Sequence, residues 1–189
     1  MNNHEIIYYP TEKDILELVE LDKLVYTNNN IGTFEKCKEW LSVNPNIYTI
    51  LKYNNKIIGY INFFPVTNEC YNKIKSGEMK DYEIKASDLA KFITNKPQKC
   101  LFDSIVIHPD FQTGTALIKL WNGFIKKLKS LNAKVSSVIM DCVSEIGERS
   151  AIKTLNAKFI TNSINGKIYE GTLDHILKNK VGDFICKKK

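Results

Sequence analysis

The sequence contains no apolar run that approaches the roughly 20 residues a membrane-spanning helix needs. Its start, Met1-Asn-Asn-His-Glu, lacks the basic and then apolar pattern of a secretion signal. No internal repeat and no low-complexity linker interrupts the chain. We therefore expect a cytoplasmic protein without a membrane partner, in which residues 1–189 form a single domain.

Cysteine and histidine are too scattered to form a recognisable metal or redox motif. The three histidines lie far apart, and no pair of cysteines has zinc-ligand or redox spacing. We therefore expect no metal site, and we expect buried or idle thiols in a reducing cytoplasm. The five cysteines are Cys37, Cys70, Cys100, Cys142 and Cys186.

The composition is that of an ordinary globular protein with a basic balance. Hydrophobic residues make up 43% of the 189 positions, and the formal net charge is +6. Such a charge fits a nucleic-acid partner, a polyanionic cofactor or a mildly basic surface. The lysines are spread along the chain without interleaved aromatic residues, so we expect no nucleic-acid partner.

Strands and helices alternate in the residue pattern. Thr11 and Thr33 are predicted to cap helices, while Asn54-Asn55 and Asn165-Gly166 predict tight hairpins. Gly59 inside a strand indicates a bulge or a close backbone approach. The predicted strands are residues 5–10, 47–52, 56–64, 100–107, 134–142, 159–162 and 167–172, and the predicted helices start at residues 11, 33, 67, 88 and 144.

Residues 67–98 are the least regular part of the pattern. Two short helices are predicted there, at 67–77 and 88–92, before Pro97 ends the segment. We interpret residues 67–98 as an insertion over the sheet and a candidate substrate lid. A helical connection without a role fits the sequence equally well.

The stretch from Cys100 to Leu131 is the most informative part of the chain. An apolar strand stops at Pro109, a turn of small residues follows, and a long amphipathic helix continues from there. Free backbone N–H groups and the helix dipole then favour an anion such as a pyrophosphate at the turn. Most helix starts bind nothing but water or a capping side chain, so this feature alone is a weak signal.

The order of the predicted elements resembles the GCN5-related N-acetyltransferase (GNAT) superfamily over roughly residues 5–173. Residues 105–112 look like the family's fourth strand and the beginning of its coenzyme-binding loop. Asn156-Ala157-Lys158-Phe159 looks like the motif that ends the following helix. The resemblance implies an α/β (α+β) fold with a mixed, mostly antiparallel central sheet, flanked by helices and splayed at the fourth strand.

The resemblance also implies a site for acetyl-coenzyme A (acetyl-CoA) as co-substrate. The family's loop places glycines at fixed positions, but here Gly114 and Ala116 each lie one place early, so the loop is one residue short. Thr113 and Thr115 could still supply hydroxyl and amide donors. The expected coenzyme-binding residues are Val106, Ile107, His108, Gln112, Thr113, Gly114, Thr115 and Ala116.

The catalytic groups follow from the same resemblance. Many family members carry a tyrosine that protonates the leaving thiolate, and Ile152 occupies its place here. Either Tyr169 or water serves as the acid, or the thiolate leaves unassisted. For the base we expect Asp103, because a carboxylate is unusual in an otherwise apolar strand and indicates a functional role. Asp141 is the second candidate. A solvated or lysine-paired carboxylate is the alternative for both.

We therefore expect an N-acetyltransferase that moves an acetyl group from acetyl-CoA to an amine by direct attack on the thioester. The alternative is a catalytically silent GNAT-like protein that binds a ligand or partner. The acceptor is a small molecule or a peptide, and a homodimer is left open. Glu69, Asp81 and Glu83 could recognise a cationic acceptor, although exposed loop charges are more often only solvated.

Overall fold

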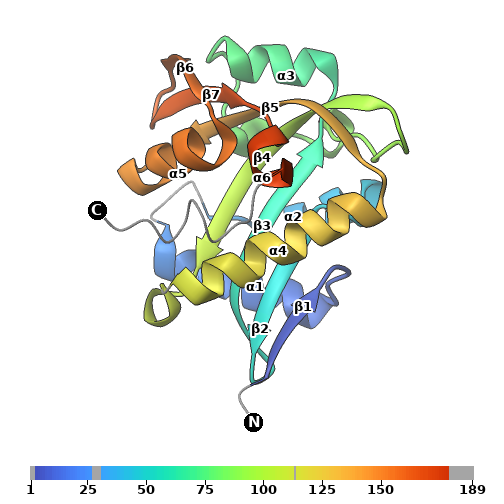
Figure 1. The fold of residues 1–189 in the computed structure, drawn as a ribbon, viewed down its shortest axis with the longest axis vertical. Helices are drawn as coiled ribbons and strands as arrows, with labels where there is room; N and C mark the ends of the chain where they lie inside the picture. Colours follow the sequence, from blue (N-terminus) through green and yellow to red (C-terminus); the bar gives the residue numbers. More distant parts are fainter. Residues whose placement is uncertain (1–2, 27–30, 113, 179–189) are drawn as a thin grey trace.

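The computed structural model describes residues 3–26, 31–112 and 114–178, which form a seven-stranded sheet in the order β1-β2-β3-β4-β5-β7-β6 (Figure 1). Neighbouring strands are antiparallel except for the parallel pair β4–β5. This arrangement confirms the predicted fold class. The strands are β1 (His4–Ile7), β2 (Tyr48–Tyr53), β3 (Lys56–Pro65), β4 (Pro97–Ile107), β5 (Lys134–Cys142), β6 (Lys158–Asn162) and β7 (Lys167–Gly171).

The helices begin where capping side chains satisfy free backbone N–H groups. Thr11 and Asp14 form a reciprocal capping box at the start of α1, and Thr33 and Ser144 cap α2 and α5. Asn156 ends α5 in the left-handed conformation, at φ 49°. The helices are α1 (Glu12–Val25), α2 (Phe34–Val43), α3 (Asn68–Lys75), α4 (Gly114–Ser130), α5 (Glu145–Leu155) and α6 (Asp174–Lys178), with 3₁₀ turns η2 (Asp81–Glu83), η3 (Ala86–Asp88) and η4 (Pro109–Phe111).

Two apolar clusters cover the two faces of the sheet. On one face, which we call the α1 face, side chains of α1, α2 and α3 pack against Leu101, Val106 and Ile139. On the other, the α4 face, side chains of α4, α5 and α6 pack against Phe102 and Met140. Figure 1 shows α4 in front of the sheet with α1 and α2 behind it. Any side chain of β4 or β5 can thus be assigned to one face.

The sheet opens between its two parallel strands. The β4–β5 ladder stops at the pair Leu101–Ile139, although β4 continues to Ile107 and β5 to Cys142. On its other side β4 stays paired with β3, where the register jumps from Asn62–Ser104 to Phe63–Phe102 and leaves Asp103 as the extra residue of a β-bulge. The predicted splay at the fourth strand is therefore confirmed.

Both predicted hairpins form, but only the first has the predicted tight turn, since residues 163–166 separate β6 from β7 and neither Asn165 nor Gly166 has positive φ. Asn54 and Asn55 have positive φ between β2 and β3, and Gly166 lies in the turn between β6 and β7. Gly59 approaches the neighbouring strand closely, because a Cβ there would lie 2.7 Å from the Val106 carbonyl oxygen. The predicted close backbone approach at Gly59 is thus confirmed.

The segment at residues 67–98 differs from the prediction in its second half. Helix α3 forms, and its Cys70, Tyr71 and Ile74 are buried on the α1 face. The predicted helix at 88–92 is wrong, since η3 ends at Asp88, Leu89 forms a β-bridge with Val66, and residues 90–92 are not helical. Burial of Leu89 beside the sheet fixes an extended backbone there, which overrides local propensity.

Two strands have other ends than the sequence predicts. β4 starts at Pro97, three residues earlier than predicted, and β1 ends at Ile7 rather than at residue 10.

The cysteines that the structure describes, at positions 37, 70, 100 and 142, are buried and free, while Cys186 lies outside the described residues. None of the helices in the described part of the chain is both long enough and apolar enough to cross a membrane.

Candidate functional site: a cleft between two parting strands

A cleft of about 520 Å³ lies where β4 and β5 part. Its walls come from both strands, from the C-terminal end of α1, from the first turns of α4 and from one side of α5. Past Leu101 the β5-facing edge of β4 has no ladder partner in the described residues, so its backbone groups are available to a ligand. The splay therefore combines a cavity with an unpaired strand edge.

The structure brings four of the ten predicted catalytic and coenzyme-binding residues to this cleft. Asp103, Ile107, Gln112 and Gly114 line it. The others lie elsewhere: the side chains of Val106 and Ala116 are buried in the two apolar clusters, Thr115 is exposed, and the His108 ring accepts a hydrogen bond from the Asp110 backbone N–H at 3.2 Å. Thr113 falls outside the described residues.

The start of α4 forms one end of the cleft. Gly114 is the first residue of this 17-residue helix and contributes to the cleft wall. The first-turn N–H groups of a helix have no partner within the helix, and the helix dipole adds positive potential there. Gln112 orders the approach to the helix by donating from its side-chain amide to the Ile107 carbonyl at 3.5 Å. This end of the cleft suits an anionic group.

Asp103 lies in the bulge of β4 and is the most perturbed carboxylate of the cleft. The Asn62 amide and the Ser104 hydroxyl donate to its Oδ2 at 3.4 and 3.3 Å. Burial raises the pKa of Asp103 to about 7, and repulsion from Asp81 acts in the same direction, while Lys36 opposes both. A carboxylate with this pKa can take and return a proton near neutral pH.

Asp141 lies across the cleft from Asp103, on β5. Its neighbours Met140 and Cys142 point to the α4 face, so alternation along the strand places the Asp141 side chain on the α1 face. The Ser163 hydroxyl donates to Asp141 Oδ1 at 2.8 Å. Burial raises the pKa of Asp141, and repulsion from Asp81 adds to the effect.

Three polar groups near Asp103 were not predicted from the sequence. Tyr26, at the end of α1, lines the cleft. Behind it, the Tyr60 hydroxyl donates to Asp22, and burial raises the pKa of Asp22 to about 6. The sequence gives no signal for this set, because α1 and β3 are more than thirty residues apart and only the tertiary fold joins them.

The predicted acids occupy different places. The Tyr169 hydroxyl donates to Glu148 at 2.9 Å, a bond that raises the pKa of Tyr169, and Tyr169 is not part of the cleft wall. Its role as an acid stays a prediction. Ile152 is 49% exposed and also lies outside the cleft wall, whereas Ser150 of the same helix lines it.

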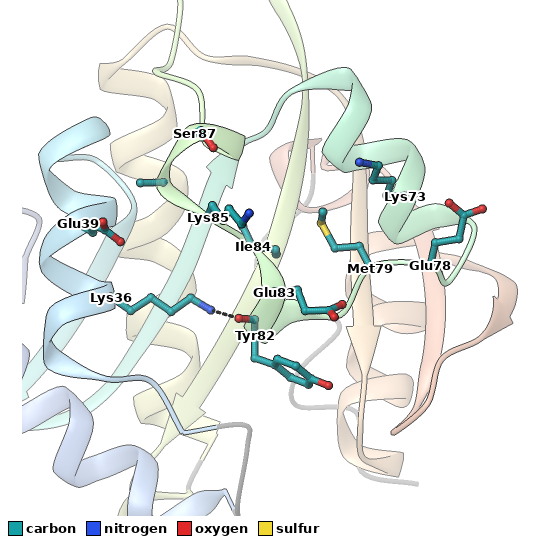
Figure 2. Close-up of a pocket in the computed structure, with 11 residues that line it drawn as sticks. Lys36, Glu39, Lys73, Glu78, Met79, Tyr82, Glu83, Ile84, Lys85 and Ser87 are labelled. Atoms are coloured by element: carbon teal, nitrogen blue, oxygen red, sulfur yellow. Dashed lines mark hydrogen bonds between the residues drawn. The ribbon is translucent and has the colours of Figure 1, made fainter.

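A second, more open hollow of about 1020 Å³ lies between α2, α3 and the segment that carries η2 and η3. Figure 2 shows Lys36 reaching from α2 to the Tyr82 carbonyl, with Met79 and Lys73 on the opposite side. The wall mixes lysines with glutamates, so it has no dominant charge. In the described residues, no group of three or more His, Cys, Asp and Glu side chains is arranged to hold a metal ion.

The sheet order, the single parallel pair and the splay define the fold of the GCN5-related N-acetyltransferases, and comparison with solved structures supports this assignment. The loading GNATL domain of CurA from Lyngbya majuscula aligns with a TM-score of 0.58 and 13% identity, over 92% of this chain and 100% of that one. No family model and no curated protein matches the sequence.

Two further structures of the same fold were solved with coenzyme. The PaiA N-acetyltransferase from Thermoplasma acidophilum, in complex with coenzyme A, gives a TM-score of 0.57 at 12% identity and covers 90% of this chain and 99% of that one. YncA from Salmonella typhimurium, with its cofactor acetyl-CoA, gives 0.54 at 10% identity, with 90% and 94% coverage. At these identities the likeness establishes the fold.

Proposed function

We propose that the protein is an acetyl-CoA-dependent N-acetyltransferase that acts on an amine. The observation that carries the proposal is the position of Asp103, a carboxylate with a pKa of about 7 in the bulge of β4, at the wall of the cleft between the parting strands. The coenzyme-bound relatives of the same fold support the choice of co-substrate.

The cleft fits acetyl-CoA in two respects. The unpaired edge of β4 at the backbone of Ile107, which lines the cleft, would hydrogen-bond the amide-containing arm of the coenzyme. The His108 backbone N–H donates to the Ile58 carbonyl of β3 at 2.8 Å and so faces the other side of the strand. The first-turn N–H groups of α4, from Gly114 onward, would bind its pyrophosphate. When bound, the coenzyme supplies an acetyl group activated as a thioester.

The residues on the α1 face would then prepare the amine. Asp103 takes a proton from the acceptor ammonium, and the neutral nitrogen forms a bond with the acetyl carbonyl carbon. A backbone N–H of the β4 edge stabilises the oxyanion while the carbon–sulfur bond breaks and the thiolate leaves. As the carbon–sulfur bond breaks, the attacking nitrogen loses its second proton to solvent, and the thiolate takes up a proton from solvent or from a nearby hydroxyl. Tyr169 stays a predicted donor for that proton.

The test is release of free thiol from acetyl-CoA in the presence of amines. We expect amine-dependent thiol release above the rate of coenzyme hydrolysis, with the acetylated amine detected by mass spectrometry. Coenzyme binding without thiol release from any amine would instead favour the catalytically silent GNAT-like binding protein. That second candidate is supported by Ile152, which stands where many relatives carry an acid.

Gly114→Pro tests the anion site at the start of α4. Proline is well tolerated at the first position of a helix but removes its backbone N–H. We expect coenzyme affinity to fall about tenfold, since one charge-assisted hydrogen bond is lost. Calorimetry with coenzyme A measures the change, and Asn122→Ala, an exposed change further along α4 that keeps every N–H of the first turn, serves as the control. Equal affinity in Gly114→Pro and the native protein would exclude this N–H from coenzyme binding.

We also propose a reducing cytoplasm as the site of action. The buried, free thiols of the described cysteines support this location, because thiols persist under reducing conditions.

A further inference from the structure

We infer that the acceptor is an amine that carries at least one more cationic group, held by carboxylates that converge on the α1 face of the cleft. The inference rests on the proposed function and narrows its substrate class. It depends on the placement of Asp103, Asp141 and Asp81, on the charges around them, and on a buried amide oxygen of Asn62 that has no donor.

Asp103 and Asp141 stand at the same level of the opened sheet. Each lies two residues beyond the last paired residues of its strand, Leu101 and Ile139. Both line the cleft, and Asp141 points to the α1 face. Asp103 interacts electrostatically with Lys36 of α2 and Asp22 of α1, which places its side chain on the α1 face too. Each of the two strands that border the cleft, β4 and β5, therefore contributes one carboxylate to it.

Asp81 supplies a third carboxylate from the segment at residues 67–98. Lys36 of α2 donates to the backbone carbonyl of Asp81 at 3.2 Å. It also donates to the carbonyl of Tyr82 at 3.0 Å, the contact drawn in Figure 2, and the two bonds fix the η2 turn to α2. After burial, repulsion from Asp81 is the next cause that raises the pKa of Asp103, and it also raises that of Asp141. Asp81 does not itself line the cleft, and its Oδ1 accepts a hydrogen bond from the Tyr82 backbone N–H at 2.7 Å, but its charge acts on both Asp103 and Asp141.

These carboxylates have no ion-pair partner in the part of the chain that the structure describes. Within the described residues, no ion pair includes Asp81, Asp103 or Asp141, and the cleft wall contains no lysine or arginine. Lys36 acts on Asp103 electrostatically, but its ammonium donates to backbone carbonyls. In a chain with net charge +6, this face concentrates negative charge that a cationic ligand would neutralise.

Asn62 gives an independent indication of a missing donor. Its side chain is 3% exposed, and its amide lies against Asp103, to which Nδ2 donates at 3.4 Å. The Oδ1 atom of the same amide is buried and has no hydrogen-bond partner. A buried carbonyl oxygen without a donor is costly. An ammonium group bound at Asp103 carries up to three N–H donors and could satisfy both side chains.

The charge pattern selects among amines. A monoamine would neutralise one carboxylate and leave the others facing each other. A free amino acid would bring its own carboxylate into an acidic site, which is unfavourable. A diamine or larger polyamine places one nitrogen at Asp103 for reaction and a second cation within reach of Asp81 or Asp141. The chemistry therefore favours a flexible organic cation with two or more amines.

The test compares putrescine, a butane chain with an amine at each end, with butylamine in the thiol-release assay. We expect kcat/KM for putrescine to exceed that for butylamine by at least tenfold, the ratio for one charge-assisted contact. In Asp81→Asn and Asp141→Asn this preference should fall about tenfold. Glu78→Gln, an exposed carboxyl change in the same segment of residues 67–98, is the matched control and should keep the preference.

Thermal unfolding without coenzyme gives a second readout that does not require turnover. Putrescine should raise the Tm more than butylamine does, and Asp81→Asn should abolish the difference. Equal kcat/KM for the two amines, or a preference unchanged in both variants, would overturn the inference while leaving the transferase proposal intact. Absence of thiol release with every amine would instead contradict the proposed function. The Tm comparison would then be the remaining test of whether the carboxylates bind a cation with two amines.

Discussion

Asp103→Asn is expected to lower kcat/KM for amine acetylation by about a hundredfold or more while leaving coenzyme affinity unchanged. General base catalysis typically contributes factors of this size. Asparagine keeps the shape of the side chain and its contacts with Asn62 and Ser104, but it cannot accept the proton of the ammonium. The change therefore separates catalysis from binding.

The pH profile gives the same prediction a second readout. Asp103 is a base only when ionised, and its pKa is about 7, so kcat/KM should rise with pH and level off above that value. In Asp103→Asn the inflection near pH 7 should disappear. Asp174→Asn, an exposed carboxyl change on α6, is the control. A loss smaller than about threefold, or an inflection that persists, would remove Asp103 from the role of base.

Lys127→Met is expected to abolish a rise of stability with pH. Lys127 of α4 is 4% exposed, and its ammonium donates to the Tyr48 carbonyl and the Thr49 hydroxyl. No ion pair in the described part of the chain includes it. Burial lowers the pKa of Lys127 to about 7.

The sign follows from proton linkage. Between pH 7 and the ordinary lysine pKa, the unfolded chain holds a proton on Lys127 that the folded chain has released. The free energy of unfolding should therefore rise with pH in that window, by up to about 1.4 kcal/mol per pH unit relative to Lys127→Met. Below pH 7 both states are protonated and the contribution is constant.

Urea unfolding at pH 7 and pH 10 measures this difference. From pH 7 to pH 10, the free energy of unfolding of the native protein should rise by about 3 kcal/mol more than that of the Lys127→Met variant. Lys129→Met, an exposed change on the same helix, should follow the native protein. Parallel pH dependence in the native protein and Lys127→Met would contradict a displaced titration of this lysine.

Local features of the fold were predictable because they depend on neighbouring residues. Thr11, Thr33 and Ser144 cap helices because their side-chain oxygens reach backbone N–H groups three residues ahead. Asn54-Asn55 forms a hairpin because asparagine tolerates positive φ. The helix expected at 88–92 failed because a bridge between Leu89 and Val66 decides that conformation, and this contact crosses more than twenty residues.

The same distinction holds for the site. Asp103 was found from sequence because a carboxylate in an apolar strand is conspicuous. Asn62, Tyr26 and Lys36 were missed because ordinary helix and strand patterns contain such residues, and only the tertiary fold brings them near Asp103. Asp81 was named among three acidic residues, but the Lys36 contact that positions its turn could not be read from the sequence.

Binding of acetyl-CoA, measured by calorimetry on the native protein and two tryptophan variants, tests the central claim most directly. Ser150 lines the cleft, so Ser150→Trp should fill it, whereas Ile152→Trp adds the same side chain to an exposed position on the same helix. We predict micromolar affinity for the native protein and Ile152→Trp, and at least about tenfold weaker binding for Ser150→Trp. No binding at millimolar acetyl-CoA, or equal affinity in all three proteins, would contradict a coenzyme site between β4 and β5.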